Sequence, residues 1–133
     1  MKPKDRLVIK NKYNGHCAYC GIKLGSRFHI DHIFPRSNAC YLKSPTMREI
    51  FNLDTINLSD VDDVANLNPS CERCNRWKQT YSIEQFRKEI ELQVERLRRT
   101  QAGFRLAEDF GIIQERNTAV VFYFEYPEFK DLQ

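Results

Sequence analysis

Two cysteine pairs of identical spacing, Cys17/Cys20 and Cys71/Cys74, constrain the fold of this chain more than any other feature. Two thiolates separated by two residues can hold one metal ion, and two such pairs supply the four sulfur ligands of a tetrahedral structural zinc site. The pairs lie about fifty residues apart, so that a whole segment of chain is enclosed between them. We therefore predict a four-cysteine zinc site that joins residues 17–20 to residues 71–74.

Composition and leader signals suggest a compact intracellular protein. The hydrophobic share of 41% and the charged share of 29% are ordinary for a globular domain, and 133 residues suffice for one such domain. No apolar run approaches the roughly 20 residues of a membrane span, and no apolar leader follows the basic first dozen residues. We expect a single domain over residues 1–133, reduced cysteines, no membrane contact and a cytoplasmic location, including the nucleoid or a host cell.

Positive charge is concentrated in the first half of the chain. The net charge is only +3, but residues 1–50 carry ten Lys and Arg against three acidic residues. This excess is typical of a surface that meets phosphate groups, and an ordinary solvated face explains it equally well.

Local signals predict an α+β chain. Residues 3–13 have the composition of a short helix that ends at Asn14-Gly15, and residues 28–34 read as a strand that Pro35 terminates. Another helix is expected to begin at Cys71 or Cys74. Residues 44–63 are expected to contain a small helix, with Thr46 and Glu49 as its capping box, and then a solvated acidic loop.

The C-terminal part, about 82–130, is predicted to be a helical and strand extension. Ser82 and Gln85 form a capping box for a long amphipathic helix over residues 83–99. Its apolar stripe is expected to face the core, with a partner surface as the alternative. A shorter helix is expected over residues 104–110. Residues 118–126 give the strongest strand signal, and such a strand would join a sheet within the monomer or pair with a second copy in a homodimer.

The segment enclosed by the cysteine pairs carries a set of residues suited to phosphodiester hydrolysis. Asp31 and His32 are adjacent, and Asn75 directly follows Cys74. An imidazole can deprotonate water, while carboxylate and amide oxygens are ligands that Mg²⁺ accepts. Because side chains alternate along a strand, Asp31 and His32 can reach one site only at a strand end or a distortion.

The order of these residues resembles the HNH endonuclease family, which has a ββα-metal fold. The resemblance covers about residues 15–80 and rests on C-x2-C, D-H-x-x-P, N-L-x-P and C-x2-C-N-x-x-K, which occur in the segments CAYCG, HIDHIFPRS and ANLNPSCERCNRWKQT. It implies a ββα-metal core around the four-cysteine zinc, with flanking helices and a C-terminal β-strand. The long spacer at residues 44–63 departs from the pattern.

The resemblance also implies a role for each matched residue. His32 would be the general base, Asn66 would fasten the loop between the strands so that His32 is oriented, and Asp31 and Asn75 would hold a catalytic cation. Because the last motif residue is Asn rather than His, Mg²⁺ or Mn²⁺ is expected in place of zinc there. Lys78, at a position where the family often has a basic residue, would meet a phosphate. Apart from the resemblance, Arg36 and Arg76 are expected contacts with the DNA backbone, and an ordinary surface charge explains each of them equally well.

We therefore expect a metal-dependent DNA endonuclease, a phosphodiester hydrolase that leaves a 5′-phosphate, in a phage, mobile-element or defence setting. The alternative is a non-catalytic zinc-knuckle module that binds nucleic acid or protein. That alternative explains the cysteine pairs and the basic half, but it does not explain why Asp31, His32, Asn66 and Asn75 occur in register.

Overall fold

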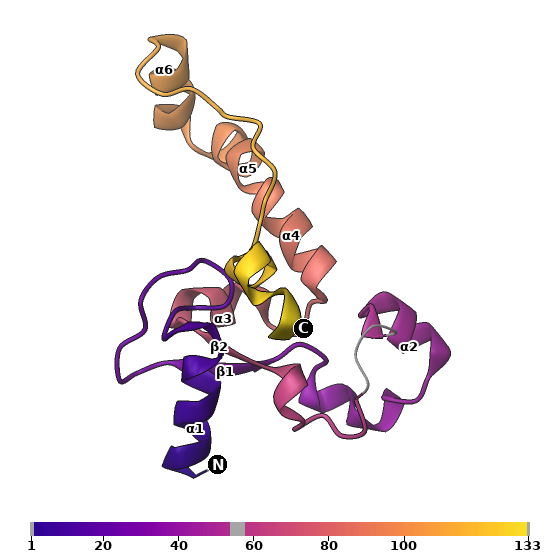
Figure 1. Cartoon of the computed structure of the whole chain (residues 1–133). Coiled ribbons are helices and arrows are strands. Elements are labelled where there is room, and N and C mark those ends of the chain that lie inside the picture. Colours follow the sequence, from indigo (N-terminus) through magenta and orange to yellow (C-terminus); the bar gives the residue numbers. More distant parts are fainter. Residues whose placement is uncertain (1, 54–57, 133) are drawn as a thin grey trace.

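The centre of the fold is a short antiparallel sheet followed by a helix (Figure 1). This computed structural model describes residues 2–53 and 58–132. Strand β1, His29–His32, pairs in antiparallel fashion with strand β2, Leu67–Ser70. Helix α3, Glu72–Lys78, follows β2 after a single residue and packs against β1. The chain is therefore α+β, as predicted.

The N-terminal helix packs on β2. Helix α1, Pro3–Lys10, begins on a proline, whose missing N–H is not needed in the first turn, and continues into the 3-10 helix η1, Asn11–Tyr13. Asn14 then ends η1 with φ of 56°, a left-handed conformation that asparagine tolerates. This agrees with the helix predicted for residues 3–13.

The segment between the strands folds into a small lobe rather than a simple loop. It contains the 3-10 helix η2, Arg36–Tyr41, the helix α2, Pro45–Ile50, and the 3-10 helix η4, Val64–Asn66. Its buried apolar side chains are Phe34, Leu42, Phe51, Leu53, Leu58 and Val61. The solvated loop expected within residues 44–63 is thus only the surface of a packed unit, and residues 54–57 of that prediction lie outside the described residues.

Helix α2 exists as predicted, but its cap differs from the prediction. The backbone N–H of Met47 donates to Oγ of Ser44 at 3.4 Å, so Ser44 is the N-cap. Thr46 lies inside the first turn of α2, which puts it beyond the position from which a side chain can cap.

Three helices form an arm that projects from the body of the molecule (Figure 1). They are α4, Ile83–Glu91, α5, Gln93–Thr100, and α6, Ala102–Asp109. The Ser82/Gln85 capping box is present, but the single helix predicted for residues 83–99 is interrupted at Leu92. Among the described residues no helix is both long and apolar enough to cross a bilayer.

The apolar stripe predicted for residues 83–99 lies in the core only at its first position, in contrast to the core position that the sequence predicted for the whole stripe. Phe86 is 2% exposed, whereas Ile90 and Leu97 are 36% and 43% exposed. Only the first turns of α4 contact the body of the molecule, so the later stripe residues on α4 and α5 do not pack into its core.

The predicted C-terminal β-strand is wrong. Residues 114–122 run without regular structure, and the described chain then forms the 3-10 helices η5, Tyr123–Glu125, and η6, Pro127–Leu132. The segment does not extend the sheet; instead, the N–H groups of Tyr123 and Phe124 donate to the carbonyls of Tyr19 and Ala18 at 3.0 and 2.8 Å. Its β-forming aromatic residues are used for packing.

These aromatic residues complete the main core beside the cysteines. The cluster consists of Tyr13, Cys17, Ala18, Tyr19, Leu24, Cys74, Phe86, Phe122, Phe124 and Phe129. Phe122 stacks on Phe86 with ring centroids 5.3 Å apart and meets Tyr19 edge-on at 5.6 Å. The C-terminal segment thereby fixes α4 against the turn that carries the first cysteine pair.

Candidate functional site

The four paired cysteines converge on one point. Cys17 and Cys20 lie on a tight turn after η1, Cys71 is the N-cap of α3, and Cys74 lies in its first turn. Their four Sγ atoms lie within 4.8 Å of one another, and those of Cys20 and Cys71 are 3.8 Å apart. A tetrahedral zinc with Zn–S bonds of about 2.3 Å requires sulfur atoms roughly 3.8 Å apart. Four cysteines this close together can bind zinc.

The turn that presents the first pair depends on glycine. Gly21 has φ of +78°, and a Cβ built there would lie 2.9 Å from Cδ2 of Tyr123. The Gly21 N–H donates to the Cys17 carbonyl at 3.0 Å, and the Cys17 N–H donates to the Ile22 carbonyl at 2.8 Å. A side chain at position 21 would therefore disturb both the turn and the aromatic contact above it.

The electrostatics of the cluster favour thiolate at one of the two buried sulfurs. A hydrogen bond from the Cys74 thiol lowers the pKa of Cys17 to about 4. The same hydrogen bond, together with burial, raises the pKa of Cys74. Arg73, whose pKa is raised by its contact with Cys20, adds positive charge at the exposed side of the cluster. A divalent cation bound by four thiolates would leave the cluster negatively charged, and Arg73 would offset part of that charge.

A cavity of about 260 Å³ lies at the end of β1. It is lined by Ile30, Asp31, His32, Pro35, Arg36, Ser37, Asn75, Gln79 and Thr80. Three residues singled out from the sequence, Asp31, His32 and Asn75, are thus brought together. His32 is the last residue of β1, so adjacent side chains reach one cavity at a strand end.

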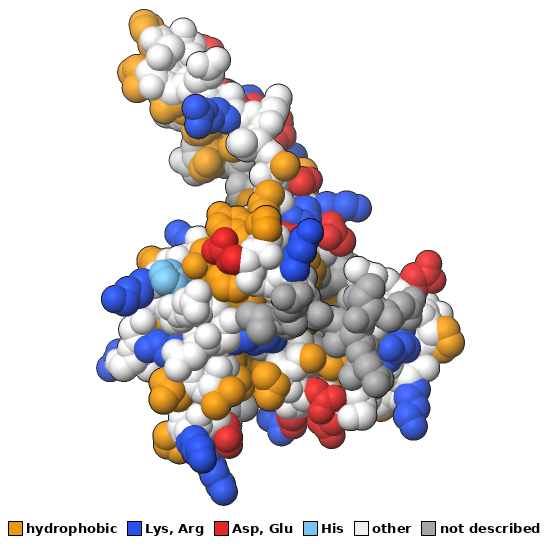
Figure 2. Space-filling model, viewed as in Figure 1, with side chains coloured by type: hydrophobic (Ala, Val, Ile, Leu, Met, Phe, Trp, Pro, Cys, Tyr) orange, Lys and Arg blue, Asp and Glu red, His pale blue; other side chains and the backbone are white. Residues whose placement is uncertain are grey.

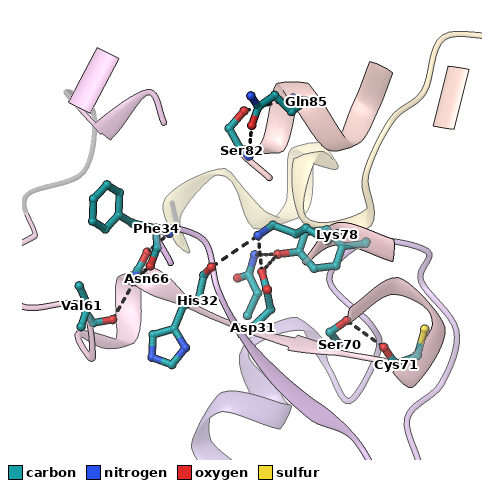
Figure 3. Close-up of polar contacts among 12 residues, drawn as sticks. Asp31, His32, Phe34, Val61, Asn66, Ser70, Cys71, Lys78, Ser82 and Gln85 are labelled. Carbon is teal, nitrogen blue, oxygen red and sulfur yellow. Dashed lines mark hydrogen bonds and ion pairs between the residues drawn. The ribbon is translucent and has the colours of Figure 1, made fainter. Parts of the chain in front are cut away.

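Asp31 is held in a buried polar network (Figure 3). Its Oδ2 accepts a hydrogen bond from the Tyr19 hydroxyl and lies 2.9 Å from Nζ of Lys78. Asn68 donates to the Tyr19 oxygen at 3.4 Å and accepts from the Tyr13 hydroxyl at 3.3 Å. Burial raises the pKa of Asp31, and Lys78 and Tyr19 oppose this shift.

Asp31 also lines the cavity, although the residue is only 5% exposed. The contacts with Tyr19 and Lys78 are both made by Oδ2, which leaves Oδ1 as the candidate ligand atom of this carboxylate. The side chain of Asn75 makes no hydrogen bond within residues 2–53 and 58–132, so its amide oxygen is available in the same cavity.

The surface role predicted for Lys78 is wrong. Its side chain is 0% exposed, and Nζ also donates to the His32 carbonyl at 3.4 Å. A lysine in this position is buried because Asp31 faces it across the gap between α3 and β1. It cannot contact a DNA backbone; it neutralises a buried carboxylate instead.

Asn66 is fully buried and connects the beginning of the spacer, just after β1, with its end, just before β2 (Figure 3). Its Oδ1 accepts from the N–H of Phe34 at 2.7 Å, while Nδ2 donates to the carbonyls of Phe34 and Val61 at 3.0 and 2.7 Å. Ile33 also donates its N–H to the Asn66 carbonyl at 2.9 Å. These contacts fix the chain directly after His32.

His32 has a partner that the sequence did not reveal. Its Nε2 lies 2.8 Å from Oδ1 of Asp62, and the two side chains are 20% and 56% exposed. The hydrogen bond from His32 lowers the pKa of Asp62. Asp62 falls in the acidic spacer, thirty positions from His32, and no spacing rule connects the two.

The other predicted contacts with nucleic acid lie at the surface. Arg36 is exposed and lines the cavity beside His32. Arg76 is exposed and pairs with Glu72 one turn earlier in α3, with Nη2 2.7 Å from Oε1. Cys40, the cysteine outside the two pairs, is also exposed.

A larger cavity of about 470 Å³ lies by the cysteine cluster, where the arm joins the body. It is lined mainly by apolar side chains from the cysteine turn, α3, α4 and the C-terminal segment, among them Trp77, Phe86, Ile90 and Phe122. Figure 2 shows hydrophobic side chains gathered at this junction. The cavity contains none of Asp31, His32 or Asn75.

No family model, no curated protein and no solved structure matches this chain.

Proposed function

We propose that this chain is a metal-dependent DNA endonuclease of the HNH type. The observation that carries the proposal is the shared cavity of Asp31, His32 and Asn75 at the end of β1, where Asn75 directly follows the last residue of the four-cysteine cluster. A base, a hard carboxylate oxygen and an amide oxygen open to one cavity are the parts that single-cation phosphodiester hydrolysis needs. The antiparallel pair β1–β2 followed by α3 is consistent with the ββα core that the sequence resemblance implies.

In this proposal the zinc is structural. Cys71 and Cys74 belong to α3, whereas Cys17 and Cys20 belong to the turn before β1. One ion on all four sulfurs would clamp the start of α3, and Asn75 is the next residue after the last ligand. The zinc would thus set the place of Asn75 without taking part in the reaction.

The donor set of the cavity fits a hard divalent cation. Oδ1 of Asp31 and the amide oxygen of Asn75 are oxygen ligands, and Mg²⁺ or Mn²⁺ commonly binds through one or two such groups with water filling the remaining positions. Lys78 weakens this fit because its charge lies 2.9 Å from the other oxygen of Asp31. When bound, the cation would supply charge stabilisation to the phosphate and to the leaving oxygen.

His32 would act as the base in this proposal. The side chain is part-exposed at the cavity wall, and its backbone is fixed by the Asn66 contacts to the following residues. It would take a proton from a water molecule that attacks phosphorus. Arg36, at the same cavity, would bind a neighbouring backbone phosphate.

One observation favours a non-catalytic zinc-knuckle module instead. Asp31 is already neutralised by Lys78 and hydrogen-bonded by Tyr19, as expected of a purely structural carboxylate. In that alternative the four cysteines would hold the fold and the basic surface would bind nucleic acid or protein.

A plasmid-nicking assay decides between the two functions. Zinc-loaded protein is incubated with supercoiled plasmid in Mg²⁺ or Mn²⁺, with EDTA as the metal-free control. His32→Ala tests the base, and His29→Ala, an exposed position on the same strand outside the cavity, is the matched control. The endonuclease proposal expects nicking by the wild type and by His29→Ala but not by His32→Ala. No nicking by the wild type in either metal, or equal nicking by His32→Ala, would contradict it.

A further inference from the structure

We propose that Asp62, contributed by the spacer between the strands, is a positioning residue that fixes the ring orientation and tautomer of His32. This inference rests on the proposed endonuclease function and assigns the spacer a part in it. The contact between His32 Nε2 and Asp62 Oδ1 at 2.8 Å joins a residue at the end of β1 to one thirty positions later.

The chemistry of the contact determines which ring nitrogen is free. A carboxylate only accepts hydrogen bonds, and a histidine ring nitrogen facing it must therefore carry the proton. The lowered pKa of Asp62 keeps it a carboxylate near neutral pH. A neutral His32 paired in this way holds its proton on Nε2 and leaves the lone pair on Nδ1, which makes no hydrogen bond with any described residue.

The spacer is built so that Asp62 is presented to His32. Oδ2 of Asp63 accepts from the N–H groups of Ser59 and Asp60 at 3.0 and 3.2 Å, and Oδ1 of Asp60 accepts from the N–H of Asp62 at 2.8 Å. These bonds shape the turn without using the Asp62 side chain. The Asp62 carboxylate is thus free to pair with His32.

A single side chain keeps the two partners in register. Asn66 binds both the backbone of Phe34, two residues after His32, and the carbonyl of Val61, directly before Asp62. Because one buried amide holds both segments, a shift of the spacer relative to β1 would break its hydrogen bonds as well as the His32–Asp62 contact. The buried side chain of Asn66 therefore fixes the relative position of His32 and Asp62, and their contact is not a chance encounter of surface charges.

In the reaction, Nδ1 of His32 would take a proton from water as the water oxygen bonds to phosphorus. The bond between phosphorus and the leaving oxygen breaks, its electron pair stays on that oxygen, and the oxygen gains a proton from solvent. The imidazolium that forms keeps its Nε2–H on Asp62, whose negative charge stabilises it. Asp62 acts through His32 and does not touch the phosphate.

The test compares Asp62→Ala with Asp62→Asn and, as a matched control, with Asp109→Ala, which removes an exposed acidic side chain on α6 far along the arm. Ring ¹⁵N NMR on the zinc-loaded full chain at about pH 9 reports the tautomer of each histidine, and the chain contains only three. We expect the Nε2–H tautomer of His32 to dominate in the wild type, to persist in Asp62→Asn, whose amide oxygen still accepts, and to become mixed in Asp62→Ala.

Nicking kinetics provide the second readout. We expect kcat of Asp62→Ala to fall roughly 10-fold to 100-fold, below the 10²–10⁴ that a general base supplies, because Asp62 is half-exposed. KM for DNA should change by less than about twofold, since Asp62 does not contact substrate, and Asp109→Ala should match the wild type.

The two readouts separate the inference from the proposed function. An active wild type whose Asp62→Ala variant keeps both the tautomer and kcat would overturn the role of Asp62 alone. A wild type that shows the expected tautomer but no nicking in either metal would overturn the proposed function, and the catalytic meaning of the pair with it.

Discussion

The buried ion pair between Lys78 and Asp31 makes a quantitative prediction about stability. The two side chains are 0% and 5% exposed, and their charged atoms are 2.9 Å apart. Lys78→Met keeps most of the volume of the side chain but leaves the carboxylate of Asp31 buried without its cation. Removing one partner of a buried pair costs roughly 3–5 kcal/mol, and we expect this variant to lose about 4 kcal/mol of its free energy of unfolding at pH 8.

The loss should depend on pH in a direction set by Asp31. Burial raises its pKa above the ordinary 3.8, and Lys78 is the largest influence opposing that shift. Without Lys78 the folded-state pKa rises further. Between the unfolded and folded pKa values the folded chain binds the additional proton, so its stability falls as pH rises through this window. The deficit of Lys78→Met relative to the wild type should therefore be smaller at pH 5 than at pH 8.

Urea unfolding at both pH values, with a fixed concentration of free zinc, measures this deficit. Lys88→Met, an exposed change on α4, should stay within about 0.5 kcal/mol of the wild type. In Lys78→Met/Asp31→Asn the buried charge is also removed, and part of the loss should return, with a coupling energy at the upper end of about 0.5–3 kcal/mol. A cost below about 1 kcal/mol at pH 8, or an equal deficit at both pH values, would refute the reasoning.

Three further changes test other parts of the structure. Cys71→Ser removes one of the four clustered sulfurs, and we expect the zinc content, measured by plasma mass spectrometry, to drop well below one per chain. The variant should also unfold, because structural zinc contributes roughly 10–16 kcal/mol to folding in small peptides. Full retention of zinc would contradict the four-ligand site. Asn66→Ala leaves three buried backbone groups without their partner at about 1–3 kcal/mol each, so its urea midpoint should fall sharply while zinc content is retained. Gly21→Ala combines a φ of +78° with a contact of 2.9 Å to Tyr123 and should cost about 1–2 kcal/mol or more by thermal unfolding, whereas Gly25→Ala, whose added Cβ meets no described atom within 4 Å, should be nearly neutral.

The parts of the site that the sequence predicted are those fixed by short-range spacing. The spacing of two residues within each cysteine pair is a local signal, and it correctly indicated the cysteine cluster, with α3 starting at the second pair as expected. The proline signal indicated the strand but placed its end two residues too late, because β1 ends at His32. Given those elements, the meeting of Asp31 with Asn75 follows from geometry, because α3 packs against β1.

The features that the sequence did not predict depend on contacts between distant segments. A lysine is ordinarily exposed, and Lys78 is buried only because a carboxylate forty-seven positions earlier faces it. The pairing of His32 with Asp62 requires the spacer to fold into its own lobe, which composition alone did not indicate. Residues 118–126 have high β-propensity, but this propensity mainly reflects how well side chains pack on neighbouring surfaces. Here the aromatic side chains of the segment pack into the main core, and the backbone does not join the sheet.

The same distant contacts explain how α3 is held as one rigid element. A zinc ion on the four clustered cysteines would anchor its first turn to the cysteine turn, while Lys78, about one turn beyond Cys74, anchors its end to Asp31 on β1. Asn75 lies between the two anchors and cannot move relative to the cavity without straining one of them. Loss of zinc would release only the first anchor, and the buried ion pair would still hold the other end. The cavity should therefore depend on both the four-cysteine cluster and the Lys78–Asp31 pair, so that damage to either one loosens the placement of Asn75 against His32.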